Sequence, residues 1–310
     1  TAVCCLSSVN LEHFDEWSKV DTFIPDLITM LDNVLQNFMD SVKGKTGYNK
    51  AAYSAMRERS VGLGAMGFHS YLQKNNIAFE SMYASSFNNK AFSYIKDRAS
   101  ATTRKLAEER GEAPDMEGSG KRNAHLLAIA PNASSSIICG GTSPSIEPNR
   151  ANVYTHKTLT GSFKVKNKYL DDLLLELVPS KKKRDEIWKD IAAHEGSVQH
   201  LDILSDSQKE IFKTAPEINQ IWIIEHAAMR QKYVCQSQSV NLFFKTPSIE
   251  ADQETHDVFL QYLNDVHWAG IHKLKSLYYL RSNAARNTEN VNIKIPKINL
   301  EEEGCLSCEG

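Results

Sequence analysis

A short run of small hydroxyl residues near the middle of the chain has the composition of a phosphate-binding turn. Residues 126–130 are apolar and of strand length, and a proline and an asparagine follow before three serines. A helix that begins at such a turn points free backbone N–H groups outward, and its dipole adds partial positive charge, so the place suits a phosphate. An ordinary helix N-cap is the alternative interpretation of these residues alone. The turn consists of Pro131, Asn132, Ala133, Ser134, Ser135 and Ser136.

Cysteine and tyrosine side chains supply the other candidate chemistry. Cys4 lies on an expected buried strand, where a cysteine is most often a small apolar residue. Tyr278 and Tyr279 are adjacent, so on a strand they face opposite sides, but two stacked phenols could also relay a proton and an electron. Cys305 and Cys308 have the spacing of a reversible disulfide. A zinc site there needs two further ligands and the sequence has no second C-x-x-C, so we predict no metal.

The composition is that of a globular protein without a nucleic-acid or membrane partner. The 310 residues are 41% hydrophobic and 24% charged, and 36 basic against 38 acidic residues give a net charge of −2. No apolar run reaches the roughly 18 residues that a membrane span needs. Six cysteines are too few for a disulfide scaffold in a chain of this length, which favours a cytoplasmic protein with reduced or catalytic thiols.

The spacing of apolar residues predicts the elements that must position these side chains. Short apolar runs predict strands at 1–11, 126–130, 239–244 and 277–280. Three- and four-residue spacing predicts helices at 24–38, 82–110, 167–178, 181–194 and 251–276, with two more between 206 and 232. This alternation indicates an α/β fold with mainly parallel strands. The periodicity ends at Ser282, so we expect one catalytic unit at 1–281 and a flexible, redox-active tail at 282–310.

A literal G-x-G-x-x-G begins at Gly62 but does not predict a dinucleotide site. The residues before it, 56–60, do not form a buried strand, and no second strand ending in an acidic residue follows about twenty residues later. We expect instead that these glycines allow close packing of the segment against its neighbours.

Taken together, these features resemble the C-terminal half of the large (α) subunit of class I ribonucleotide reductase. The matching segments occur in the order of that family, and each is weak by itself. They are 2–11, 59–64, 122–123 with 131–136, 145–148, 152–155, 161–163, 236–241 and 268–281.

The resemblance implies a fold and two roles at the active site. The family fold is a ten-stranded α/β barrel, of which this chain would form the C-terminal half with five mainly parallel strands and their helices. Cys4 matches one of the two cysteines that supply electrons and become a disulfide, and Cys5 stands where a non-reactive residue is usual. Residues 132–136 match the loop that holds the phosphates of the ribonucleoside diphosphate substrate.

The resemblance also implies a radical path and a route for electrons. Tyr278 and Tyr279 match the tyrosine pair that carries the radical from the small subunit to the active cysteine. Cys305 and Cys308 match the tail pair that re-reduces the active-site disulfide. The expected partners are therefore a radical-bearing small (β) subunit, with its tyrosyl radical and di-iron centre, and thioredoxin or glutaredoxin.

The chain departs from the family at its radical cysteine. That residue lies in an Asn-x-Cys-x-Glu motif, which these 310 residues lack. We expect the motif, the partner of Cys4 and the sites for allosteric nucleotides on an N-terminal α fragment, so the chain alone should be inactive and bind no cofactor. A natural split gene, as in some phages, is the favoured origin, which would place the protein in the host cytoplasm. The alternatives are a non-catalytic assembly subunit and a thiol–disulfide oxidoreductase acting through Cys305 and Cys308.

Overall fold

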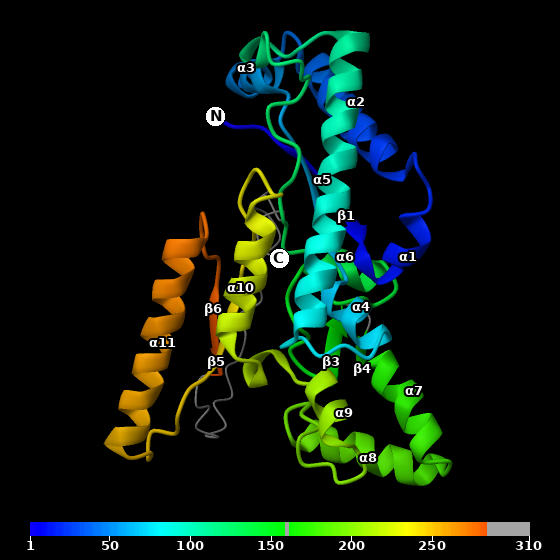
Figure 1. Cartoon of the computed structure of the whole chain (residues 1–310), viewed down its shortest axis with the longest axis vertical. Helices are drawn as coiled ribbons and strands as arrows, with labels where there is room; N and C mark the ends of the chain where they lie inside the picture. The colour runs from blue at the N-terminus through cyan, green and yellow to red at the C-terminus, as the bar shows by residue number, and fades with distance from the viewer. Residues whose placement is uncertain (159–160, 284–310) are drawn as a thin grey trace.

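Helices alternate with short strands in a computed structural model that describes residues 1–158 and 161–283 (Figure 1). The strands are β1 (Cys5–Asn10), β2 (Val61–Met66), β3 (Val153–Thr158), β4 (Gly161–Lys166), β5 (Leu242–Lys245) and β6 (Leu280–Asn283). The longer helices are α2 (Phe23–Val42), α3 (Asn49–Glu58), α5 (Met82–Arg110), α7 (Lys168–Leu177), α8 (Lys181–Ala193), α10 (Gln220–Gln231) and α11 (Gln253–Lys273). The short helices are α1 (Phe14–Trp17), α4 (Phe68–Lys74), α6 (Ala133–Ile138) and α9 (Asp206–Ile211), with 3-10 turns at Leu11–His13, Pro114–Met116 and Ala215–Glu217.

Parallel pairing connects five extended segments in series. β1 pairs with β2 along its whole length. A parallel bridge joins Leu63 of β2 to Leu127, and another joins Ile129 to Gln238. β5 then pairs in parallel with β6. The predicted α/β fold with mainly parallel strands is confirmed, and the predicted strand at 126–130 is an extended segment held by isolated bridges.

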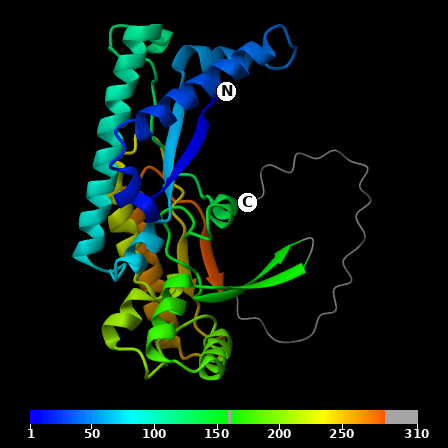
Figure 2. The ribbon, with the colours of Figure 1, turned by 90° about the vertical axis from the view of Figure 1, so that its right-hand side faces the viewer.

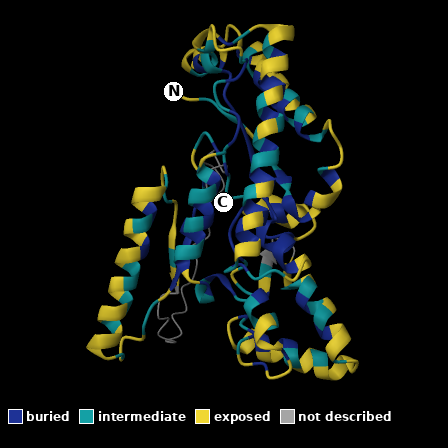
Figure 3. Cartoon of the chain, viewed as in Figure 1, coloured by how far each residue is buried: buried dark blue, intermediate teal, exposed yellow. Residues whose placement is uncertain are grey.

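The hydrophobic core lies between this series of strands and the helices α2, α5 and α10. Buried residues of α2 recur at three- and four-residue spacing, which confirms the amphipathic helix predicted at 24–38. All six residues of β2 are buried. Figure 3 shows the buried residues concentrated on the sides of α5 and α10 that face the strands, whereas α11 is largely exposed. Among the described residues, no helix has both the length and the apolar character needed to span a bilayer.

Three sequence predictions need correction. The strand predicted as buried at the N-terminus is half-buried, because only Val9 of β1 is enclosed. The strand predicted at 277–280 begins at Leu280. The antiparallel hairpin of β3 and β4 was not predicted at all, and it projects from the body of the molecule (Figure 2). The described residues of the hairpin are mostly exposed, and the alternation of apolar and basic residues over 163–166 is a strand signal that the sequence prediction missed.

The glycines of the G-x-G-x-x-G segment pack as predicted. A Cβ atom on Gly62 would lie 2.4 Å from a methyl carbon of Leu6 and 3.0 Å from the Cβ of Ala128. A Cβ atom on Gly64 would lie 2.4 Å from the carbonyl oxygen of Ala128. Both glycines thus let β2 approach β1 and the 126–130 segment closely. The segment is itself strand β2 and follows helix α3, which supports the rejection of a dinucleotide site.

A buried carboxylate ties the starts of two neighbouring extended segments to helix α2. The Asp32 side chain is completely buried, and its two oxygens accept hydrogen bonds from the Nε atoms of Arg59 and Arg122, each at 2.8 Å. Arg110 of α5 adds a third ion pair at 3.2 Å, and the amide of Asn123 donates at 3.1 Å. Burial raises the pKa of Asp32, but the two arginine hydrogen bonds outweigh it and lower the pKa overall. The ionised form therefore stabilises the fold at neutral pH, and this contribution is lost as the pH falls through the folded-state pKa.

Replacing this carboxylate should destabilise the protein strongly. Asp32→Asn leaves the buried guanidinium groups without a counter-charge, and we expect it to lower the free energy of unfolding by about 3–5 kcal/mol. Urea unfolding followed by circular dichroism at neutral pH measures the change. Asp40→Asn, at an exposed position of the same helix, is the control and should cost less than about 0.5 kcal/mol. Equal losses in the two variants would contradict the role given to Asp32.

Candidate active site

Alternation along β1 separates a helix-facing side from a side that carries the candidate chemistry. Val9 joins the core beneath the helices. Cys4 and Ser8, four residues apart, point to the opposite side, since successive residues of a strand alternate. The contacts agree: a Cβ on Gly62 would meet the Cys4 Sγ at 3.1 Å, and one on Gly64 would meet the Ser8 Oγ at 3.2 Å. Cys4, Ser8 and the two glycines therefore share one face, which we call the thiol face.

The Cys4 thiol is partly enclosed and keeps its proton at neutral pH. Burial raises its pKa, a hydrogen bond with the Gln236 side chain lowers it, and the neighbouring Cys5 and Cys235 raise it further, with a net increase. Gln236 also donates to the carbonyl oxygen of Val61 at 3.0 Å, so its amide is fixed against β2. A protonated, partly exposed thiol suits hydrogen and electron donation better than attack as a thiolate.

Asn132 joins the serine turn to the thiol face. It has a left-handed backbone, with φ 55° and ψ 26°, and precedes helix α6. Its side-chain nitrogen donates to the Ser8 Oγ at 3.0 Å and to the carbonyl oxygens of Ala65 and Ala130 at 3.3 and 3.2 Å. Its side chain makes no hydrogen bond that caps α6. The amide therefore fixes the turn to β1 and β2, and does not occupy the N–H groups of the first turn of α6.

The three serines of the turn differ in what they offer to a ligand. Ser134 and Ser135 are exposed, as is Ala133, and Pro131 is half-buried. Ser136 is buried, and its hydroxyl donates to the carbonyl oxygen of Ala133 at 3.0 Å. The predicted order of extended segment, turn and helix is present, with two serine hydroxyls open to solvent.

The rings of the two adjacent tyrosines contact each other in a tilted arrangement. The ring centroids of Tyr278 and Tyr279 lie 4.1 Å apart at an interplanar angle of 47°, and both side chains are about half exposed. A hydrogen bond with Tyr279 raises the pKa of Tyr278. The opposite-facing arrangement expected on a strand does not occur because both residues precede β6. The backbone N–H of Tyr278 donates to Val240 at 2.9 Å and that of Tyr279 donates to the Asn241 side chain at 3.1 Å.

A buried carboxyl lies behind the tyrosine pair and was missed in the sequence. The Asn241 amide that accepts from Tyr279 also donates to Glu147 at 2.8 Å. Burial raises the pKa of Glu147, and the hydrogen bond from Asn241 and the charges of Arg150 and Arg281 oppose this increase. Both residues of this hydrogen bond lie in segments that match the family, but a separation of 94 residues gives no local signal that they meet.

A cavity of about 1160 Å³ lies beside the carboxyl ends of β5 and β6. Its lining includes Arg150, Lys245 and Arg281, together with Phe243. The predicted tail cysteines, Cys305 and Cys308, lie outside the described residues. Within the described residues, the structure thus brings Cys4 and the serine turn to one face, and holds the tyrosine pair directly before β6, the last strand of the same parallel series.

The fold and these side chains define an α/β domain with mainly parallel strands and a cysteine-bearing face. Residues 1–121 and 113–280 match the family model described as the ribonucleotide reductase barrel domain, and the chain belongs to this family.

Individual relatives agree with this assignment. The chain is 45% identical to the ribonucleoside-diphosphate reductase large subunit of Invertebrate iridescent virus 3, over 100% of this chain and 48% of that protein. It is 46% identical to a putative large subunit of Frog virus 3, over 100% of this chain and 52% of the relative. The class Id ribonucleotide reductase alpha subunit of Actinobacillus ureae superposes with a TM-score of 0.79 and 40% identity, over 91% of this chain and 50% of that one. The chain thus spans about half the length of these relatives.

Two substitutions at Asn132 should separate the contribution of its hydrogen bonds to stability from the cost of its left-handed backbone conformation. Asn132→Ala loses the hydrogen bonds to β1 and β2 and places alanine in a left-handed conformation, so it should lower the free energy of unfolding by about 3 kcal/mol. Asn132→Gly loses the same hydrogen bonds without the conformational cost, and should be about 1 kcal/mol more stable than the alanine variant. Urea unfolding of both variants measures the difference. If both match the parent protein, the turn is not fixed to the sheet through this side chain.

Proposed function

We propose that this chain is the C-terminal part of the catalytic α subunit of a class I ribonucleoside-diphosphate reductase. It would reduce ribonucleoside diphosphates to deoxyribonucleotides by a radical mechanism after assembly with an N-terminal α part and a radical-bearing small subunit. The observation that carries the proposal is the meeting of a protonated thiol, Cys4, and the serine turn on one face of a parallel sheet. The relatives' names favour this function over a non-catalytic assembly subunit or a free-standing thiol–disulfide oxidoreductase.

The five parallel segments would form one half of a ten-stranded barrel. Each segment pairs with the next in a series that runs from β1 to β6. A sheet whose end strands are unpaired exposes backbone donors and acceptors that a second set of strands can satisfy. The N-terminal part would supply that second half, together with the radical cysteine and the sites for allosteric nucleotides.

The serine turn would bind the diphosphate of the substrate. Ser134 and Ser135 present exposed hydroxyls beside the start of α6, and the Asn132 side chain leaves the first N–H groups of the helix uncapped. Backbone N–H groups and hydroxyls at a helix N-terminus suit the negative charge of a phosphate. The hydrogen bond from Asn132 to Ser8 would set the distance between the bound phosphates and the thiol face.

Cys4 would act as one of two reducing thiols. Its partner cysteine would come from the N-terminal part. The two thiols together supply two electrons and two protons, the ribose 2′-hydroxyl leaves as water, and the thiols become a disulfide. The raised pKa of Cys4 fits this role, because the thiol must still carry its proton when the substrate is bound.

Tyr278 and Tyr279 would relay the radical between the small subunit and the active cysteine. Each phenol would give up an electron and its O–H proton together, and ring centroids 4.1 Å apart are close enough for transfer between neighbours. The tyrosyl radical and di-iron centre would belong to the small subunit, so this chain would bind no cofactor of its own. Cys305 and Cys308 would then reduce the active-site disulfide and be reduced in turn by thioredoxin or glutaredoxin.

Removing either phenol hydroxyl should stop turnover. Tyr278→Phe and Tyr279→Phe each keep the ring but lose the O–H group that the relay uses. Activity would be measured as deoxyribonucleotide formation by the chain combined with an N-terminal α part and a small subunit, and we expect a loss of at least about 1000-fold. If the hydroxyls only made a structural hydrogen bond, each substitution would cost about 1 kcal/mol of stability and little activity.

The control for this experiment is Tyr83→Phe, which changes an exposed phenol on α5. It should leave turnover unchanged. Nucleotide binding to the tyrosine variants should match the parent assembly, which separates a broken relay from failed assembly. Near-normal turnover in either Tyr278→Phe or Tyr279→Phe would remove that residue from the radical path.

The tail cysteines should be needed for repeated turnover and not for the first. A Cys305→Ser/Cys308→Ser variant should make about one product per active site when thioredoxin is the reductant. It should cycle normally with a small dithiol, since such a molecule can reach the active-site disulfide directly. Rapid-quench measurements of the product formed per active site distinguish a single turnover from repeated turnover. Normal cycling of the double variant with thioredoxin would show that the tail does not carry the electrons.

A further inference from the structure

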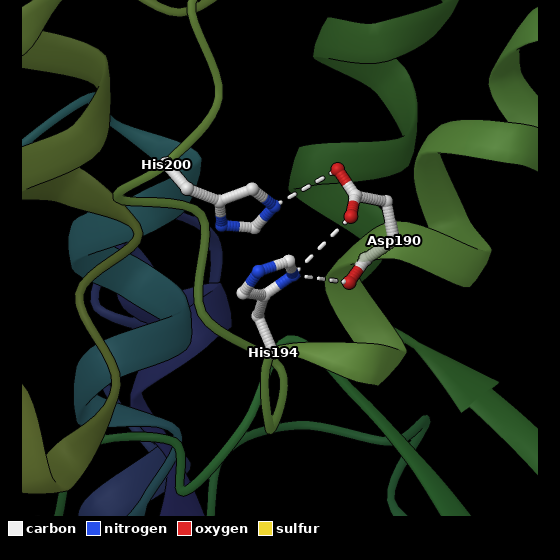
Figure 4. Close-up of side chains that lie close together, drawn as sticks. All are labelled: Asp190, His194 and His200. Atoms are coloured by element: carbon white, nitrogen blue, oxygen red, sulfur yellow. Dashed lines mark hydrogen bonds and ion pairs between the residues drawn. The ribbon is translucent and has the colours of Figure 1, made fainter.

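Two histidines and one aspartate meet at the end of helix α8, away from the thiol face. Asp190 lies in the last turn of α8, His194 follows one turn later, and His200 comes from the loop beyond (Figure 4). Their candidate ligand atoms all lie within 4.8 Å of one another. Among the cysteines of the sequence, only Cys305 and Cys308 have the spacing of a metal-ligand pair, and no prediction covers these three residues.

The distances suit a shared metal ion. The Nδ1 atom of His194 lies 3.2 Å from one carboxylate oxygen of Asp190, and the Nε2 atom of His200 lies 3.0 Å from the other. With Zn–N and Zn–O bonds of about 2.0–2.2 Å, neighbouring ligand atoms of a tetrahedral site are roughly 3.3 Å apart. The two imidazole rings stack with centroids 3.7 Å apart and 24° between their planes. Both rings therefore contact the same carboxylate directly, and the Nδ1 atom of His194 also lies 2.9 Å from the backbone carbonyl oxygen of Asp190. A bound ion would take the place of these hydrogen bonds after small movements of the side chains.

The scaffold beneath these side chains holds them in place without a metal. Trp188 and Ile191 bury the inner side of α8, and the Trp188 ring nitrogen donates to Asp171 of α7 at 2.9 Å. Gly196, at a φ of 86°, turns the chain after His194, and its N–H donates to the carbonyl oxygen of Ile191 at 2.8 Å. A Cβ atom at this glycine would lie 2.5 Å from the Cβ of Ala151, so only glycine fits the turn.

The loop that carries His200 is fixed by the same turn. The carbonyl oxygen of Gly196 accepts hydrogen bonds from the backbone and the side chain of Asn152, at 3.1 and 3.0 Å. Val198 is fully buried two residues before His200. The backbone that carries His194 and His200 is therefore already ordered, so binding an ion would mainly restrict the side chains.

We propose that Asp190, His194 and His200 bind one divalent transition-metal ion, with Zn²⁺ as the representative ion. Two imidazoles and one carboxylate form a ligand set that suits transition-metal ions. Mg²⁺ and Ca²⁺ bind such a set less well, because they take mainly oxygen ligands. Three protein ligands leave a fourth position for water or another group. His194 and His200 also line the cavity that holds Arg150 and Arg281, so this open position would face the cavity.

Cobalt is a suitable probe for this site, because the chain also has cysteines that can bind metals. The experiment titrates Co²⁺ and Zn²⁺ separately into the complete chain carrying Cys305→Ser/Cys308→Ser. We expect one equivalent of Co²⁺ to bind with visible bands typical of nitrogen and oxygen ligands, and without the intense near-ultraviolet bands of a cobalt–thiolate bond. Calorimetry with Zn²⁺ gives the affinity.

Ligand variants decide whether the three residues form the site. His200→Ala and His194→Gln should each weaken Zn²⁺ binding by more than about 100-fold, since loss of even an outer partner of a metal ligand costs 10- to 100-fold. His267→Ala, an exposed histidine of α11, is the matched control and should bind as the parent does. Zn²⁺ should raise the melting temperature of the parent and the control but not of the ligand variants.

Two results would overturn the proposal. One is Zn²⁺ affinity within about threefold of the parent in both His200→Ala and His194→Gln. The other is a cobalt spectrum dominated by thiolate bands, which would place the ion on the remaining cysteines. Melting curves without metal show whether the variants are folded, and His194→Gln keeps a polar group beside Asp190, so loss of binding in a folded variant is informative.

Discussion

The arrangement of the sheet depends on one buried charge. Asp32 is completely buried on α2, and it stays ionised because guanidinium groups from two other parts of the chain surround it. Arg59 lies two residues before β2, and Arg122 lies just before the 126–130 segment. A buried carboxylate without these partners would cost several kcal/mol, so the helix and the two segments must dock together. The ion pairs thus fix the starts of two neighbouring segments, and hence the relative positions of the side chains further along them.

The thiol face forms because β1, β2 and the 126–130 segment pack closely together. β2 can lie between β1 and the 126–130 segment only because Gly62 and Gly64 lack side chains. The same closeness brings Asn132 within hydrogen-bond distance of Ser8, and Gln236 to both Cys4 and Val61. The side chains of Ser8, Asn132 and Gln236 therefore form hydrogen bonds that join neighbouring segments. The exposed serines of the turn are left for a ligand.

Local patterns predicted the helices well and the contacts between segments poorly. Helix α5 has the predicted bounds of 82–110, because apolar residues recur along it and Gly111 and Pro114 follow. The partners of Asp32 are separated from it by 27 to 91 residues, and no local pattern relates such positions. The β3–β4 hairpin was missed because its alternation of apolar and basic residues is confined to 163–166 and most of its described residues are exposed. The family resemblance predicted roles for Cys4, the serine turn and the tyrosines, but none for Glu147 and Asn241, which lie behind the tyrosine pair.

The tyrosine pair and the thiol belong to one hydrogen-bonded framework. Val240 and Asn241 hold the backbone of Tyr278 and Tyr279, and they continue the segment in which Gln236 contacts Cys4. A stretch of six residues, 236–241, therefore contacts the thiol at one end and the tyrosines at the other. Ile129 donates a backbone hydrogen bond to Ser237 at 3.2 Å and accepts one from Ser239 at 2.9 Å, so the stretch cannot shift without disturbing the central pairing. The geometry between the thiol and the phenols is thus set by backbone pairing, which is more rigid than contacts between long side chains.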